Sequence, residues 1–182
     1  MLFSEKEIHL KDGRTAILRS PTREDAQALV DYMVQTAGET DFLLRTPEEC
    51  TMTVEEEAAF LQNICDSPAS VMILCVVDGV LAGNCQIVRM NRLKTRHRGT
   101  VAIALVREYW NLGIGTAMFA EMIAIAEKWG LKQLELEYIE GNDRARRLYE
   151  KMGFRTTGAL PNAICLADGT MLKDYQMVRN LE

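Results

Sequence analysis

The sequence predicts an α/β (α+β) protein with a central, mixed, mostly antiparallel and twisted sheet of about seven strands, flanked by about four helices. Three observations predict this fold. Short apolar runs rich in Val, Ile and Leu recur along the chain between turn dipeptides. Two helical patterns follow the first strand pair, and a strand–helix–strand–helix unit fills residues 101–154. Alternation of this kind is typical of sheets that are covered by helices.

The first half of the chain is predicted to hold a strand pair and two helices. Asp12-Gly13 is a strong hairpin signal, Thr22 suits the cap of a first helix, and Thr53 with Glu56 forms a capping box for a second. These signals predict a hairpin over residues 7–20, a helix over 23–35, a looser segment over 37–52 and a helix over 53–65.

The second half is predicted to hold six strands and two helices. Asp78-Gly79 and Asp168-Gly169 are turn signals between strands, and Gly130 and Gly153 follow helical patterns, where glycine is common. The helix before Gly130 is apolar on nearly every side, which predicts that it is largely covered. The predicted order is strands 71–77, 80–90 and 100–106, helix 113–129, strand 133–139, helix 142–152, and strands 154–166 and 171–179.

Length and composition bound the function. A chain of 182 residues, 48% hydrophobic and 26% charged, fits one domain over residues 1–182 with a substantial core. The formal net charge of −5 argues against nucleic-acid binding. No apolar run is long enough to span a membrane, and the charged N-terminus is unlike a signal peptide. We therefore expect a cytoplasmic protein without nucleic-acid or membrane partners.

Cysteine and histidine usage agrees with this expectation. The five cysteines are an odd number without a Cys-x-x-Cys pair, which predicts reduced thiols rather than a disulfide framework. Two histidines without ligand spacing predict no metal site.

A glycine turn after the strand over residues 100–106 predicts an anion site. Residues 109–117 read Tyr-Trp-Asn-Leu-Gly-Ile-Gly-Thr-Ala and lead into the apolar helix. Free backbone N–H groups at a helix N-terminus bind phosphate, and glycine allows a close approach. A dinucleotide fingerprint would need a small residue where Met118 stands, and a Walker loop would need Gly-Lys-Ser/Thr. A nicotinamide-dependent oxidoreductase is therefore disfavoured.

A second pattern downstream gives the turn a more specific meaning. It consists of Asn142, Ala145, Tyr149, Lys151, Gly153 and Phe154. Together with the glycine turn, this pattern resembles the GNAT superfamily of acetyl-CoA-dependent N-acetyltransferases, roughly over residues 72–155. One position departs from the family pattern, because Trp110 stands where Arg or Gln is most usual. Trp at this position resembles the branch that acetylates ribosomal-protein N-termini and its uncharacterised relatives.

The resemblance implies a GNAT fold and a cofactor site. In that fold the fourth and fifth strands diverge, and the pantetheine arm of coenzyme A pairs with the exposed backbone in the gap. The implied cofactor-binding residues are Ile103, Ala104, Leu105 and Val106 on the strand, Asn111, Leu112, Gly113, Ile114, Gly115 and Thr116 in the turn, and Asn142. The resemblance also implies that the Tyr149 hydroxyl protonates the departing thiolate. From the residues alone, Asn142 also suits a helix cap and Tyr149 a core aromatic position.

The general base is less clear from the sequence. Many relatives carry a carboxylate on the fourth strand, but none occurs over residues 100–107. Glu137 has the spacing from Asn142 that the ribosomal-protein alanine acetyltransferases use, so we take it as the candidate base. A solvent-facing position on its strand is the alternative for Glu137. A water chain, Glu39 or Asp41 remain open as the source of the base.

The acceptor site is predicted from the loop between the first two helices. Its acidic residues Glu39, Asp41 and Glu49 favour a cationic amine, and a solvated acidic loop is the alternative. A basic turn over residues 89–98 is expected to be a solvated hairpin, with an acidic partner or a coenzyme phosphate as the alternative. Arg146, Arg147 and Lys151 are expected either to contact coenzyme phosphates or to be solvated.

The sequence thus predicts an enzyme that transfers the acetyl group of acetyl-CoA directly to a primary amine of a small molecule or a peptide or protein N-terminus, without a metal. A non-catalytic acetyl-CoA-binding regulatory or structural module is the alternative. Formation of a homodimer is left open.

Overall fold

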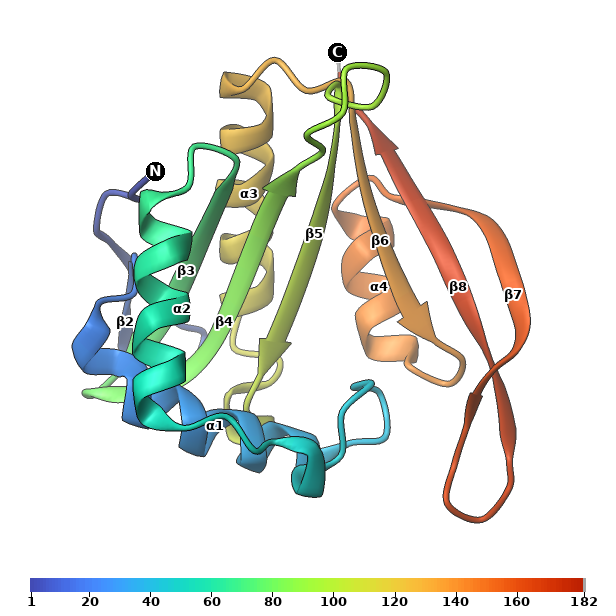
Figure 1. Ribbon diagram of the computed structural model, residues 1–182, viewed down its shortest axis with the longest axis horizontal. Helices are drawn as coiled ribbons and strands as arrows, with labels where there is room; N and C mark the ends of the chain where they lie inside the picture. Colours follow the sequence, from blue (N-terminus) through green and yellow to red (C-terminus); the bar gives the residue numbers. More distant parts are fainter. Residues whose placement is uncertain (182) are drawn as a thin grey trace.

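The computed structural model describes residues 1–181 and contains eight strands and four α-helices within them (Figure 1). In chain order these are β1 (Lys6–His9), β2 (Thr15–Arg19), α1 (Ala26–Glu39), α2 (Val54–Asp66), β3 (Ser70–Val77), β4 (Val80–Arg89), β5 (Arg98–Leu105), α3 (Ile114–Lys128), β6 (Gln133–Ile139), α4 (Asp143–Lys151), β7 (Arg155–Cys165) and β8 (Met171–Asn180). Short 3-10 turns cover Arg23–Asp25, Pro47–Glu49 and Arg107–Tyr109. The predicted fold class is confirmed, with one strand more than the seven expected.

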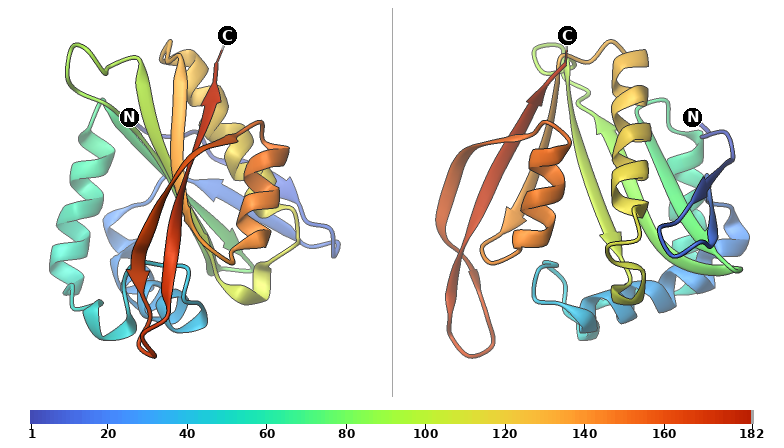
Figure 2. Two further views of the ribbon diagram at one scale, coloured as in Figure 1. Left: turned by 90° about the vertical axis from the view of Figure 1, so that its right-hand side faces the viewer. Right: turned by 180° about the vertical axis from the view of Figure 1, so that it is seen from behind.

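All eight strands form one sheet in the order β1-β2-β3-β4-β5-β6-β8-β7. Every neighbouring pair is antiparallel except β5 and β6. Helices α1 and α2 cover one face of the sheet, and α3 and α4 cover the other (Figures 1 and 2). The parallel pair is the fifth and sixth strand of this chain, because the N-terminal hairpin contributes two strands.

The helix boundaries follow the predicted caps closely. The Thr53 hydroxyl accepts from the Glu56 N–H at 3.2 Å, and the Glu56 carboxylate accepts from the Thr53 N–H at 2.8 Å. With this reciprocal pair as its cap, α2 begins at Val54, the residue after Thr53. Helix α1 runs to Glu39 instead of ending at residue 35, so it includes the start of the segment that was expected to be loose.

One part of the core lies between the sheet and α3, as the apolar pattern of α3 predicts. Ile114, Met118, Phe119 and Met122 are all fully buried. The Phe119 ring contacts the Tyr149 ring of α4, with the ring centroids 5.3 Å apart. Side chains of α3 therefore fix α4 against the same face of the sheet, and α4 carries the second sequence pattern.

Strands β5 and β6 are paired only at one end. Their register is limited to three pairs, Arg98 with Gln133, Gly99 with Leu134 and Thr100 with Glu135. Gly99 permits the close approach there, because a Cβ at this position would lie 2.8 Å from Leu131 Cδ1. Beyond these pairs the strands separate, and the gap widens toward their C-terminal ends (Figure 1). The divergence that the resemblance implies is therefore present.

An ion pair links β5 and β6 at the narrow end of this gap. The Arg98 guanidinium donates to both carboxylate oxygens of Glu135, and the Arg98 Nη2 to Oε2 distance is 2.6 Å. This pairing holds the pKa of the Glu135 carboxyl below its usual 4.5. Because Arg98 and Glu135 stand on the two separating strands, we expect the pair to stabilise the start of the gap.

Replacing Glu135 with Gln is expected to lower the free energy of unfolding at neutral pH by about 1 kcal/mol, since the pair is partly solvated. Because the carboxyl pKa is lower in the folded state, the ion pair stabilises the fold fully above the unfolded-state pKa of 4.5. This contribution is lost as the pH falls through the folded-state pKa. Urea unfolding at neutral and acidic pH measures both effects. The difference between wild type and variant should shrink in acid, and a difference that is equal at both pH values would contradict this assignment.

Candidate active site

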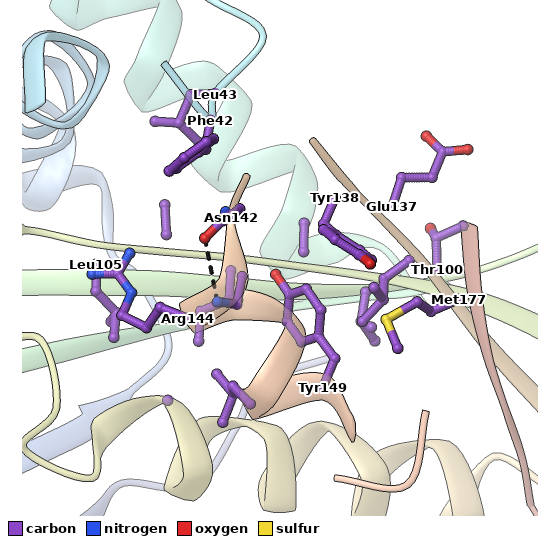
Figure 3. Close-up of a pocket in the computed structure, with 18 of the residues that line it drawn as sticks. Phe42, Leu43, Thr100, Leu105, Glu137, Tyr138, Asn142, Arg144, Tyr149 and Met177 are labelled. Carbon is purple, nitrogen blue, oxygen red and sulfur yellow. Dashed lines mark hydrogen bonds between the residues drawn. The ribbon is translucent and has the colours of Figure 1, made fainter. Parts of the chain in front are cut away.

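A cavity of about 820 Å³ occupies the gap between β5 and β6. Its walls come from the two separating strands, the N-terminal part of α4, the glycine turn before α3, the loop after α1, and strand β8. Residues far apart in the sequence therefore face one space, and Figure 3 shows part of this lining. Within residues 1–181, no group of His, Cys, Asp and Glu side chains could hold a metal ion. No helix of that part of the chain is long and apolar enough to cross a bilayer.

The β5 edge offers unpaired backbone groups to the cavity. Met90 N–H donates to the Arg98 carbonyl and Val106 N–H to the Ala82 carbonyl, each at 3.0 Å. Because hydrogen-bonded positions alternate in an antiparallel ladder, Ile103 and Leu105 direct their backbone groups away from β4, toward the gap. Both residues line the cavity.

Two of the four predicted strand residues are therefore placed differently. The backbone of Ala104 faces β4, and its carbonyl accepts from the Tyr32 hydroxyl at 2.7 Å. Val106 is buried, and its N–H is used by Ala82. The sequence could not separate these positions, because the direction of the backbone depends on the register with β4.

The glycine turn ends in a helix N-terminus without a side-chain cap. Gly113 is the residue before α3 and has φ +99°, a left-handed conformation that favours glycine. The Ala117 N–H donates to the Gly113 carbonyl. The preceding N–H groups, of Ile114, Gly115 and Thr116, belong to the first helical turn, where no carbonyl of the helix can accept from them. Asn111, Gly113, Gly115 and Thr116 line the cavity, so the turn has the properties of an anion site.

Asn142 caps α4, as the sequence allowed. Its side-chain oxygen accepts from the Ala145 N–H at 3.2 Å, the bond dashed in Figure 3. Asn142 also lines the cavity. The cap uses the amide oxygen, and the amide nitrogen is available to donate to a ligand.

The position of Tyr149 is compatible with both roles that the sequence left open. Its ring packs in an aromatic cluster with Phe119, Tyr138 and Phe154. Its hydroxyl points from α4 into the cavity (Figure 3). Burial raises the pKa of this phenol to about 12. The hydroxyl is therefore protonated at neutral pH and can donate a proton.

Trp110 and Arg144 form a pair that the sequence pattern did not predict. The Trp110 indole N–H donates to the Leu105 carbonyl at 2.8 Å, which fixes the ring at the end of β5. The Arg144 guanidinium lies on the ring face, and its Nη1 is buried without a hydrogen-bond partner within residues 1–181. Burial lowers the pKa of Arg144 to about 10. The position where relatives carry Arg or Gln thus supports an arginine from α4, a contact that only the tertiary structure reveals.

Glu137 lines the cavity from the opposite face of β6. Tyr138 packs toward Tyr149 and α4, so Glu137, one residue earlier, projects to the other side, as Figure 3 shows. Its carboxylate is exposed and accepts from the Gln176 side chain at 3.2 Å. Burial and the nearby Glu137 charge raise the pKa of Asp174. Glu135, the other glutamate of the strand, is instead held by Arg98.

The predicted acceptor residues Glu39 and Asp41 do not line the cavity. The Glu39 carboxylate accepts from the Arg107 N–H at 2.6 Å, which joins α1 to the turn after β5. Asp41 is exposed. The residues of this segment that do line the cavity are Thr36, Thr40, Phe42, Leu43, Leu44 and Arg45. Charge alone does not predict this lining, because packing decides which side chains of a loop turn inward.

The other basic residues were predicted either to be solvated or to contact coenzyme phosphates, and their positions differ. The turn over residues 90–97 is mostly exposed and lies at the end of β5 opposite the glycine turn (Figure 1), which fits a solvated hairpin. Arg146 pairs with Asp143 and Glu150 on its own helix. Lys151 donates to the Thr116 hydroxyl at 3.4 Å, so it lies beside the anion site.

Comparison with known proteins agrees with this geometry. The sequence profile of the "Acetyltransferase (GNAT) family" matches residues 27–154. The chain belongs to this family. The matched range runs from α1 through α4 and includes both sequence patterns and most of the cavity wall.

Individual acetyltransferases are similar to this chain in sequence or in fold. The L-amino acid N-acetyltransferase AaaT of Escherichia coli is 25% identical over 119 residues, 65% of this chain and 73% of that protein. A GNAT-family acetyltransferase from Streptococcus pneumoniae superposes with a TM-score of 0.86 at 28% identity, covering 91% of this chain and 99% of that one. The fold is shared with yncA, a putative acetyltransferase from Salmonella typhimurium solved with acetyl-CoA, at a TM-score of 0.78, 16% identity, and 91% and 93% coverage.

Proposed function

We propose that the protein is an acetyl-CoA-dependent N-acetyltransferase that transfers the acetyl group directly to a primary amine. One observation carries the proposal. The uncapped α3 N-terminus, the backbone of Ile103, the N–H group of Leu105 and the Tyr149 hydroxyl all face one cavity in a GNAT-family chain. All five cysteines are free thiols, which supports a reducing, cytoplasmic setting.

The cavity residues suit the parts of acetyl-CoA. The N–H groups of Ile114, Gly115 and Thr116 would hold the diphosphate, with Lys151 beside them. The backbone of Ile103 would pair with an amide of the pantetheine arm, as an added strand pairs with a sheet edge. The Leu105 carbonyl already accepts from the Trp110 indole, which leaves the Leu105 N–H for the thioester. When bound, acetyl-CoA supplies an activated acetyl group as a thioester.

Three groups of the chain would then carry the reaction. The Leu105 N–H donates to the thioester oxygen as negative charge develops on it. Glu137 accepts the proton that the amine loses, directly or through water, and the Tyr149 hydroxyl gives a proton to the departing sulfur. In this proposal the amine approaches from the Glu137 face of β6, and Tyr149 gives its proton from the α4 side.

The Glu137→Gln variant tests the assignment of the base. We expect kcat/KM to fall by about 10² to 10⁴-fold, because one general base typically contributes that much. The affinity for acetyl-CoA should not change. Glu140→Gln is the matched control, since Glu140 pairs with Lys173 outside the cavity. A Glu137→Gln enzyme that keeps full activity at every pH removes Glu137 from the mechanism.

A non-catalytic acetyl-CoA-binding module is the second candidate. It is favoured by one observation, the lack of a carboxylate on β5 facing the cavity. Release of free thiol from acetyl-CoA over a broad panel of amines separates the two functions. Tight binding of acetyl-CoA without thiol release for any amine would favour the module.

A further inference from the structure

The six charged side chains that line the cavity fall into three pairs. Lys11 and Arg144 lie near the glycine turn: the Lys11 N–H donates to the Leu112 carbonyl at 3.1 Å, and Arg144 lies on Trp110. These two cations suit the phosphate end of a coenzyme. Arg98 and Glu135 neutralise each other in their ion pair. Two charged side chains of the cavity then remain, which neither form an ion pair with each other nor were assigned to the phosphate end of a coenzyme. They are Arg45 from the loop after α1 and Glu137 from β6.

Arg45 has no counter-ion in the part of the chain that the structure describes. No carboxylate of residues 1–181 lies within ion-pair distance of its guanidinium, and its buried Nε has no hydrogen-bond partner there. Burial raises the pKa of the Glu57 carboxyl in α2, and the charge of Arg45 opposes this rise. A guanidinium with an unused, buried donor is a strong site for an anion, because its fork matches a carboxylate in two hydrogen bonds.

The loop that carries Arg45 lies at the wide end of the gap between β5 and β6. Phe42, three residues earlier, reaches the turn between β6 and α4, where its ring lies 3.5 Å from the place a Cβ on Gly141 would take. The loop therefore bridges α1 and β6 across the wide end of the gap (Figures 1 and 3). Phe42 and Leu43 line the same cavity as Arg45 and contribute apolar surface to it.

We propose that the acceptor is a small amine that carries its own carboxylate, as free amino acids do, and that Arg45 binds this carboxylate. The inference rests on the proposed function and specifies its acceptor. Arg45 and Glu137 line one cavity and carry charges opposite to those of the carboxylate and the ammonium group of such an acceptor. A peptide N-terminus offers a neutral amide in place of the carboxylate and would leave Arg45 unpaired, at the cost of a buried, unsatisfied donor.

The test compares matched acceptors. Each of several amino acids is assayed as the free acid, as its carboxamide and as the decarboxylated amine, with thiol release as the readout. We expect kcat/KM for the best free acid to exceed that of its amide and amine by about 10 to 100-fold, the worth of a charge-assisted pair. Arg45→Met should reduce kcat/KM for the acid by a similar factor and change that for the amine less than about 3-fold.

Two controls keep the result specific. Arg92→Met makes the same chemical change on the exposed basic turn and should leave kcat/KM unchanged for both the free acid and the amine. Arg45→Gln is the second variant if Arg45→Met does not fold, as judged by thermal unfolding, and the wild-type comparison stands without either. Equal or better rates with amides, amines or peptides, or an equal loss on all acceptors in the Arg45 variants, overturn the inference.

The failure of the inference differs from failure of the proposed function. A chain that binds acetyl-CoA by calorimetry and acetylates only amines without a carboxylate refutes the role of Arg45 alone. A chain that binds acetyl-CoA but acetylates no free acid likewise overturns the inference. A chain without affinity for acetyl-CoA refutes the proposed function, and the inference falls with it.

Discussion

The Tyr149→Phe variant is expected to lose about 10² to 10⁴-fold in kcat, because it lacks the phenol proton that we propose is given to the departing sulfur. The ring should still pack against Phe119, so folding and the affinity for acetyl-CoA should be retained. Steady-state kinetics and calorimetry measure the two quantities. A separate loss of affinity would instead indicate a binding role for the hydroxyl.

The raised pKa of Tyr149 adds a pH signature. Burial raises the pKa from the usual 10.0 to about 12, so the phenol stays protonated across neutral and mildly alkaline pH. Its contribution to stability is complete below 10.0 and is lost as the pH rises through about 12. The Phe variant should therefore lose less stability in this alkaline range than the wild type does.

Tyr138→Phe is the matched control for Tyr149→Phe. Tyr138 is equally buried and belongs to the same aromatic cluster, but its hydroxyl is directed away from that of Tyr149 (Figure 3). Its removal should change kcat only a few-fold, roughly the effect of a lost hydrogen bond. Equal losses in both variants would show that the cluster, not the Tyr149 proton, limits the rate.

The Gly113→Asp variant is expected to weaken acetyl-CoA binding by at least about 100-fold. A carboxylate before α3 would accept from the same N–H groups that the diphosphate needs and would repel the incoming phosphates. Losing two or more charge-assisted hydrogen bonds of about 1.5 to 3 kcal/mol each corresponds to such a factor. Calorimetric titration with acetyl-CoA measures the change.

Gly113→Asn separates charge from backbone strain. Both substitutions place a side chain at φ +99° with open space around the Cβ, so the strain is nearly the same. Asn is neutral and should bind acetyl-CoA distinctly better than Asp does. Gly130→Asn, at φ +67° beyond the other end of α3, should reduce stability without affecting binding. Equal affinities of the Asp and Asn variants would remove the anion role of the turn.

The parts of the site that are local in sequence were predictable. Gly113 and Gly115 before an apolar helix indicate a free helix N-terminus, and Asn142 with Tyr149 seven residues later indicates a cap and an inward-facing ring on the same helix. Such features depend on backbone conformation and helical periodicity over a few residues. The structure has each of them where the sequence predicts it.

The other parts depended on how distant elements meet. Ile103 and Leu105 could not be told from Ala104 and Val106, because the register with β4 decides which backbone groups are free. Likewise, the Arg98 side chain holds Glu135 and leaves Glu137 open, although the two glutamates are equivalent in the strand alternation.

The amino-acid sequence by itself thus determined the strand–helix framework, the glycine turn before α3 and the family, since these follow from local conformation and spacing. Only the tertiary structure decided which side chains face the cavity. In the loop after α1 the abundant acidic residues turn outward or bind the backbone, and the isolated cation Arg45 turns inward. The direction of a loop side chain is set by what it packs against, here the turn between β6 and α4, about a hundred residues further along the chain.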